Sequence, residues 1–120
     1  MLNLDTHIVV HAMVGKLSRK ESTLLRANPW SISAIVLWEI AKLSQLGRVE
    51  IDLDDREVRR FIGQFHVWPI TLDIVRAISA LDFRSDPADE LIAATSIVHD
   101  VPLVTRDRRL LKSKTVPLAV

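Results

Sequence analysis

The sequence predicts an α/β fold with a parallel sheet of about five short strands. Short apolar runs rich in strand-forming residues are separated by stretches in which apolar side chains recur three and four positions apart. That alternation is typical of an α/β domain. A chain of 120 residues, 48% of them hydrophobic, can bury one substantial core. We therefore expect a single domain over residues 1–120.

The expected strands are short apolar runs of five or six residues each. We expect them to be buried and parallel, over residues 1–5, 30–35, 66–70, 101–105 and 115–120. Helical periodicity is clearest over residues 34–46, 54–65, 72–81 and 87–99, and shorter helices are expected over 8–14 and 22–27. Gly47 stands where a helix should stop, and Asp86-Pro87 stands where the long helix should start.

Composition excludes several classes of site. The chain has no cysteine, which removes disulfides, thiolate metal sites and cysteine nucleophiles. The formal net charge of +1 argues neither for nor against a polyanionic partner. No apolar run approaches the roughly 18 to 20 residues that cross a bilayer, and the start of the sequence lacks the pattern of a secretory signal. We expect a soluble, cytoplasmic protein.

Two candidate site residues follow expected strands. Asp5 ends the first strand, and Asp107 follows the strand over residues 101–105 with only Arg106 between. In an open parallel sheet, ligands bind at the carboxyl ends of the strands, near the switch in strand order. Each aspartate has an equally ordinary explanation as the cap of the helical segment that follows it, which for Asp107 is the turn over residues 108–112.

Glu39 is a third candidate because it lies on an apolar helical stripe. Ile35 precedes it by four positions, and Leu43 and Leu46 follow it by four and seven. A carboxylate on such a stripe faces the core, where it must be paired with a cation, protonated or bound to a metal. A nearby arginine is the alternative to a metal.

The long helix over residues 87–99 opens with three carboxylates. Asp86, Asp89 and Glu90 crowd negative charge onto its first turn. The capping position explains Asp86, and the helix dipole favours acidic residues in a first turn. We take Asp89 as the metal candidate and keep Asp86 in reserve.

Together these carboxylates predict a metal-dependent hydrolase. Converging carboxylates raise one another's proton affinity unless a divalent cation neutralises them, and hard oxygen ligands favour Mg²⁺, with Mn²⁺ as the alternative. Such a cation activates water for attack on a phosphodiester. The expected catalytic and metal-binding residues are Asp5, Glu39, Asp89 and Asp107.

Four segments of the chain resemble the PIN-domain nucleases, in particular the VapC-type toxins of toxin-antitoxin pairs. They read LNLDTH, SISAIVLWEIAKLSQLGRV, WPIT and SDPADELIAATSIVHDVPLVTRD. The resemblance implies a three-layer α/β/α fold, a Mg²⁺-dependent endoribonuclease, a homodimer, and inhibition by a cognate antitoxin protein. It implies the same acidic quartet, with Thr6 and Thr105 as hydroxyls that support it. Related sequences often carry histidines where this chain has Phe83, Arg84 and Ser85.

Other residues leave alternatives open. A basic cluster beside Asp107 either steers an RNA backbone or forms a solvated charged face; its members are Arg106, Arg108, Arg109, Lys112 and Lys114. Each tryptophan lies within or beside an apolar segment, which indicates core packing or a dimer interface rather than base stacking. The histidines show no metal-binding spacing. A PIN-fold interaction module without catalysis and a phosphoacceptor receiver domain remain as alternatives. The receiver domain fits less well because Asp5 has no acidic neighbour and there is no Lys-Pro pair.

Overall fold

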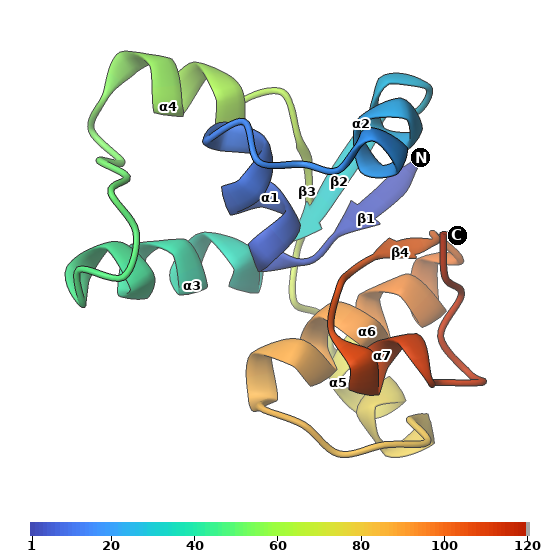
Figure 1. Cartoon of the computed structure of the whole chain (residues 1–120). Coiled ribbons are helices and arrows are strands. Elements are labelled where there is room, and N and C mark those ends of the chain that lie inside the picture. Colours follow the sequence, from blue (N-terminus) through green and yellow to red (C-terminus); the bar gives the residue numbers. More distant parts are fainter. Residues whose placement is uncertain (120) are drawn as a thin grey trace.

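A computed structural model describes residues 1–119 of the chain and has four strands in one parallel sheet. The strand order is β3-β2-β1-β4. Figure 1 shows the sheet at the centre of the molecule with helices packed around it. The α/β prediction is confirmed with four strands: β1 (Leu2–Leu4), β2 (Trp30–Ser33), β3 (His66–Trp68) and β4 (Leu103–Val104).

The helices connect the strands in the order that the sequence predicts. Pro87–His99 has the bounds expected for the long helix, and the first helix begins at Thr6 because Asp5 caps it. After the third helix, Gly47 takes a φ of +70°, a conformation that ends helices at little cost for glycine. The helices are α1 (Thr6–Met13), α2 (Arg19–Arg26), α3 (Ala34–Gln45), α4 (Arg56–Ile62), α5 (Leu72–Ala77), the 3-10 helix η1 (Ile78–Ala80), α6 (Pro87–His99) and α7 (Arg108–Leu111).

Two strand predictions are wrong in part. The expected strand over residues 115–120 forms only an isolated bridge between Leu118 and Leu103, and its last residue, Val120, lies outside the described residues. The strand at 66–70 is formed as β3, but its first two residues are exposed rather than buried. The reason is its place at the edge of the sheet, where a strand has one neighbour instead of two.

The carboxyl ends of β1 and β4 lie at the point where the strand order of the sheet reverses. From β1 the chain proceeds to β2 and β3 on one side of the sheet, and β4 then pairs with β1 on the other side. The Asp5 N–H donates to the Val104 carbonyl at 3.0 Å, so the ends of β1 and β4 stay together. Ligands bind at such points in open parallel sheets.

A buried amide fixes the long helix beneath this point. Asn3 is fully buried in β1, and its Nδ2 donates to the Ile92 carbonyl at 3.1 Å and to Ser96 Oγ at 2.9 Å. Both acceptors belong to α6. Because a buried amide without partners would be costly, these bonds set the register of α6 against the sheet.

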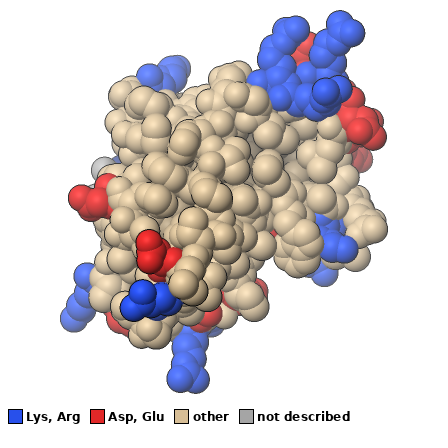
Figure 2. Space-filling view, turned by 180° about the vertical axis from the view of Figure 1, so that it is seen from behind, with Lys and Arg blue, Asp and Glu red and all other residues tan. Residues whose placement is uncertain are grey.

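The tryptophans divide between core and surface. Trp30 packs against Phe61 and Phe65, with ring centroids 6.0 and 5.6 Å apart, as core packing predicts. Trp68 stacks on His99, and Trp38 is 56% exposed. Figure 2 shows that the face behind the view of Figure 1 carries its charged side chains mainly at the margins. No helix within residues 1–119 is long and apolar enough to span a membrane.

Candidate active site

Asp5 is a buried carboxylate held through both of its oxygens. The residue is 4% exposed. Oδ1 accepts the Thr6 N–H at 2.8 Å, which is the capping bond expected from the sequence. Oδ2 accepts the hydroxyl of Thr105 at 2.6 Å. Asp5 therefore caps α1 and is also oriented by the segment that follows β4.

Glu39 reaches the same place from α3. Its half-buried carboxylate accepts a hydrogen bond from the hydroxyl of Thr6, which is the first residue of α1. No lysine or arginine within the described residues forms an ion pair with Glu39, so the arginine alternative is wrong. A single buried threonine thus links the end of β1 to the acidic residue of α3.

The first turn of α6 supplies Asp89 and Asp86. Asp89 Oδ2 accepts the hydroxyl of Ser85 at 2.9 Å, and the Ser85 N–H donates to Glu90 at 3.0 Å. Asp86 stands at the capping position, but its side chain makes no capping hydrogen bond. The prediction that the Asp86 side chain caps α6 is therefore wrong, and its carboxylate remains available to the site.

Asp107 caps α7 with one oxygen only. Oδ1 accepts the N–H groups of Arg109 at 2.8 Å and Leu110 at 3.3 Å. The Asp107 N–H donates to Thr105 Oγ1 at 3.0 Å, and the same hydroxyl donates to Asp5. Thr105 therefore links the first and the fourth acids of the predicted quartet, whose positions in the sequence are about a hundred residues apart.

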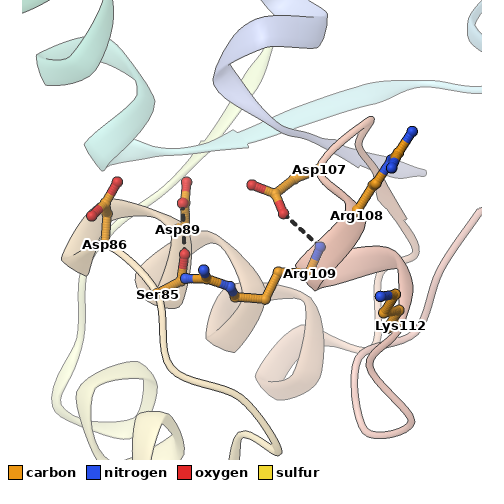
Figure 3. A pocket seen from close by; sticks show the side chains of 7 residues that line it. All are labelled: Ser85, Asp86, Asp89, Asp107, Arg108, Arg109 and Lys112. Carbon is orange, nitrogen blue, oxygen red and sulfur yellow. Dashed lines mark hydrogen bonds between the residues drawn. The ribbon is translucent and has the colours of Figure 1, made fainter.

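An open cavity of about 590 Å³ lies between the start of α6 and α7. Figure 3 shows the carboxylates of Asp86, Asp89 and Asp107 directed into a common space. Asp5 and Glu39 do not line this cavity, although their charges act on Asp89. The lining residues are Ser85, Asp86, Asp89, Asp107, Arg108, Arg109 and Lys112.

Burial and mutual repulsion disfavour charge on three members of the quartet. Burial raises the pKa of Asp5 and of Glu39, and the hydroxyl bonds from Thr105 and Thr6 offset part of each rise. Burial likewise raises the pKa of Asp89 to about 6, with the charges of Asp5, Glu39 and Asp107 adding to the effect. The pKa of Asp89 is therefore raised electrostatically by the other three acids of the predicted quartet.

The donor set suits a hard divalent cation. As the side chains lie, no three carboxylates or imidazoles among residues 1–119 are grouped to hold a metal ion. Nevertheless, Asp5, Glu39 and Asp89 each have a raised pKa, and in the described part of the chain no member of the quartet is paired with a lysine or arginine. Excess negative charge of this kind favours a bound cation with oxygen ligands.

The predicted basic residues separate into two groups. Arg108, Arg109 and Lys112 line the cavity. Arg109 Nη1 also donates to the Arg84 carbonyl at 3.0 Å. Arg106 does not line the cavity, because its guanidinium is bound to Glu21 of α2. The cavity therefore combines a carboxylate side with a basic side.

Sequence reasoning missed Ser85 and His7. Ser85 was noted only as a departure from related sequences, although its hydroxyl holds Asp89. His7 was set aside, yet it is exposed at the first turn of α1, and its charge lowers the pKa of both Asp5 and Glu39. For His7 the available signal was its position two residues after Asp5.

Comparisons with known proteins agree with this fold. The sequence matches the PIN domain family over residues 3–115. Ribonuclease VapC22 of Mycobacterium tuberculosis is 32% identical over 116 residues, covering 89% of this chain and 87% of that protein. The match does not support the receiver-domain alternative.

Three solved structures share the fold. FitAcB from Neisseria gonorrhoeae has a TM-score of 0.79 at 20% identity, covering 100% of this chain and 97% of the other. A toxin-antitoxin complex from Klebsiella pneumoniae has a TM-score of 0.73 at 22% identity, covering 93% and 91%. VapBC2 from Rickettsia felis, bound to a DNA fragment from its promoter, has a TM-score of 0.69 at 18% identity, covering 99% and 98%. The predicted resemblance is confirmed, and this chain belongs to the PIN-domain family.

Proposed function

We propose that this chain is a metal-dependent endoribonuclease and the toxin of a toxin-antitoxin pair. The relative from Mycobacterium tuberculosis is named a ribonuclease, and one similar structure is named a toxin-antitoxin complex. The site supports the same reading because it places carboxylates and basic side chains around one open cavity. The substrate is RNA, and the reaction is hydrolysis of a phosphodiester bond.

In this proposal Asp5, Glu39, Asp89 and Asp107 hold Mg²⁺ or Mn²⁺, with Asp86 in reserve. When bound, the cation supplies Lewis-acid activation of water and neutralises charge that develops on the phosphodiester. The protein's own part is to place Asp89 within reach of the charges of the other three carboxylates, a repulsion that the cation would offset.

The surrounding residues orient the acids and the substrate. The hydroxyls of Thr6 and Thr105 fix the carboxylates of Glu39 and Asp5. Arg108 and Arg109, on the basic side of the cavity, attract the RNA backbone. This positive charge faces Asp89 and Asp107 across the cavity and would bring a phosphodiester to the cation. The cation in turn would offset the repulsion between the phosphate and the carboxylates.

The observation that carries the proposal is the burial of Asp5 at the switch point of the sheet. Asp5 is 4% exposed and accepts hydrogen bonds through both carboxylate oxygens. Among the described residues, no cationic side chain is paired with it. Burying such a carboxylate is costly, and a purely structural role does not account for that cost. Capping of α1 needs only one of its oxygens. The second oxygen, oriented by Thr105, supports a role in binding a cation.

The test is cleavage of structured RNAs by the purified protein, freed of any partner, in Mg²⁺ and in chelator. We expect cleavage in Mg²⁺ only, and its loss in Asp5→Asn. Asp73→Asn is the matched control, because Asp73 is an exposed aspartate at the start of α5. Equal cleavage by wild type and Asp5→Asn would reveal a contaminating nuclease. A folded wild type that cleaves nothing would favour the interaction module without catalysis.

The toxin role and the expected partners are tested in cells and in solution. We expect induced expression to arrest bacterial growth, expression of Asp5→Asn not to do so, and co-expression of the cognate antitoxin protein to relieve the arrest. Light scattering of the purified chain tests the expected homodimer. Exposed apolar side chains such as Trp38 and Leu72 support protein contacts, since such side chains gather at interfaces.

A further inference from the structure

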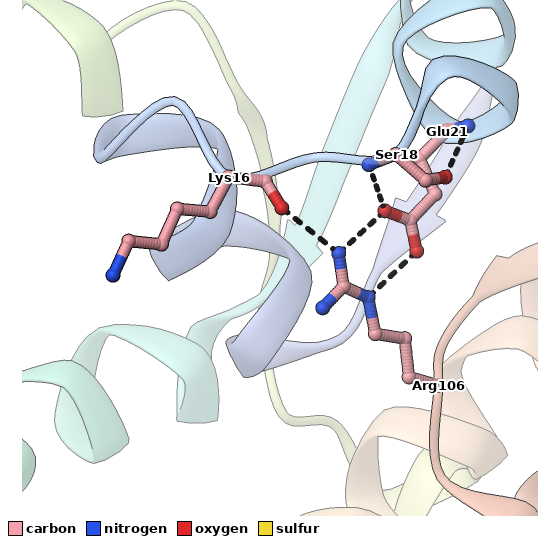
Figure 4. Close-up of polar contacts among 4 residues, drawn as sticks. All are labelled: Lys16, Ser18, Glu21 and Arg106. Carbon is pink, nitrogen blue, oxygen red and sulfur yellow. Dashed lines mark hydrogen bonds and ion pairs between the residues drawn. The ribbon is translucent and has the colours of Figure 1, made fainter.

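An ion pair between Arg106 and Glu21 connects the loop after β4 to α2. Figure 4 shows the guanidinium of Arg106 facing the carboxylate of Glu21. Arg106 Nε donates to Glu21 Oε2 at 2.7 Å, and Nη2 donates to Oε1 at 2.6 Å. This two-point geometry is the strongest arrangement of an arginine and a carboxylate. It joins segments that are 85 positions apart in the sequence.

Additional bonds hold both partners in place. Arg106 Nη2 also donates to the Lys16 carbonyl at 3.1 Å. Glu21 Oε1 accepts the Ser18 N–H at 2.8 Å, and Ser18 Oγ accepts the Glu21 N–H at 3.1 Å, which together form the capping box of α2. The Glu21 side chain is only 16% exposed. The hydrogen bond from Arg106 is the main cause that lowers the pKa of Glu21 to about 2. The pair is therefore better ordered than an ordinary surface ion pair.

Arg106 stands between two residues of the candidate site. Thr105 holds Asp5 through its hydroxyl, and the same hydroxyl accepts the N–H of Asp107. The side chain of Arg106 extends toward α2, where it meets Glu21. A guanidinium anchored at two points restrains the backbone on either side of it, so its anchoring bears on the placement of both Thr105 and Asp107.

We propose that Glu21 and Arg106 are positioning residues, which clamp the loop after β4 so that Thr105 and Asp107 meet Asp5 at the cation site. The inference rests on the proposed function, because it concerns the same site. It assigns Arg106 a different part from Arg108, which lines the cavity and is free to meet RNA. Thr105 hydrogen-bonds the proposed ligand Asp5, and displacing such an outer partner of a metal ligand lowers metal affinity about tenfold or more. Glu21 and Arg106 act on the ligands through the placement of Thr105 and Asp107.

The test is a double-substitution cycle measured by calorimetric titration with Mn²⁺ in the absence of RNA. The variants are Glu21→Gln, Arg106→Gln and the combination of both. We expect each single variant to bind Mn²⁺ about tenfold more weakly, and the combination to be no weaker than either, since both remove one interaction. RNA affinity in chelator should stay at the wild-type value.

Two controls separate the clamp from helix stability and from RNA binding. Ser18→Ala weakens the capping box of α2 but leaves the Glu21 contacts with Arg106, so it should bind Mn²⁺ as the wild type does. Arg108→Gln should bind RNA more weakly and Mn²⁺ normally. In metal-free protein, the amide resonances of Thr105 and Asp107 should shift in Glu21→Gln and not in Ser18→Ala.

The outcomes distinguish this inference from the proposed function. Wild-type Mn²⁺ affinity and unchanged amide resonances in Glu21→Gln would overturn the clamp while leaving the nuclease proposal intact. Loss of RNA affinity in Arg106→Gln, with normal Mn²⁺ affinity, would make Arg106 a substrate ligand instead. A wild type that neither binds Mn²⁺ nor cleaves RNA would overturn the proposed function. The same result would overturn the clamp, because the clamp is proposed to position the residues of a cation site.

Discussion

Replacing Asp89 by asparagine should stabilise the metal-free protein while abolishing its activity. Burial and three neighbouring carboxylates raise the pKa of Asp89 from 3.8 to about 6. One pKa unit corresponds to about 1.4 kcal/mol, so the ionised form costs at most about 3 kcal/mol. Because Asp89 is half-buried, solvent screening reduces the expected gain to about 2 kcal/mol. Asparagine keeps an oxygen that can accept the Ser85 hydroxyl and carries no charge.

The sign of the effect depends on pH. The folded protein binds the Asp89 proton more tightly than the unfolded chain, so the wild type loses stability as the pH rises from about 4 to about 6. The difference between Asp89→Asn and wild type should be small at pH 4 and reach its full value above pH 6. Urea denaturation in chelator at both pH values measures it. Thermal unfolding at pH 7 should show a rise of about 4 °C per kcal/mol.

Mg²⁺ should reverse the order of stability. A cation that binds only the folded state stabilises the wild type, and Asp89→Asn should respond little because one ligand is lost. Asp73→Asn, at an exposed site, is the control and should match the wild type with and without Mg²⁺. An Asp89→Asn variant that is equally or less stable than wild type at pH 7 in chelator would refute the view that repelling carboxylates converge on this site.

Three further substitutions test separate parts of the structure. Thr105→Val removes the hydroxyl that holds Asp5, a charged hydrogen bond worth about 1.5 to 3 kcal/mol, and should lower Mn²⁺ affinity about tenfold or more, with recovery in Thr105→Ser. Arg108→Gln should weaken RNA binding in filter assays and reduce the slope of log affinity against log salt by about one. Ile92→Ala, at a fully buried core position, should lower the free energy of unfolding by about 2 to 5 kcal/mol in urea titrations, and a loss below 1 kcal/mol would contradict the packing of α6.

The regular elements were largely predictable because their signals are local. The long helix is predicted with both of its bounds, since Asp86-Pro87 marks its start and apolar periodicity continues to His99. Local signals could not predict that the apolar run at 115–120 forms a single bridge instead of a strand. Whether an apolar run pairs along its length or makes one bridge depends on the neighbouring strand, and β4 itself is only two residues long.

The candidate site was predictable in part. Asp5, Asp107 and Glu39 could be chosen because each follows a strand or lies on an apolar helical face. Spacing alone did not reveal their partners. The resemblance to PIN domains supplied Thr6 and Thr105 as supporting hydroxyls, whereas the bond from Ser85 to Asp89 was not foreseen. The capping of Asp5 and Asp107 was offered as an alternative to a functional role. The structure has the capping bonds and leaves one oxygen of each aspartate for other contacts.

The sequence by itself determined the α/β class, the order of the elements and the acidic residues that can form a site, because periodicity, capping and strand-end position are properties of neighbouring residues. Only the tertiary structure decided which charges meet. It turned Arg106 away from the cavity to Glu21 and left Arg108 lining it, although the two arginines are two positions apart. Side chains on one loop can face opposite sides, so the partner of a charge is set by the elements that pack around it and not by its neighbours in sequence.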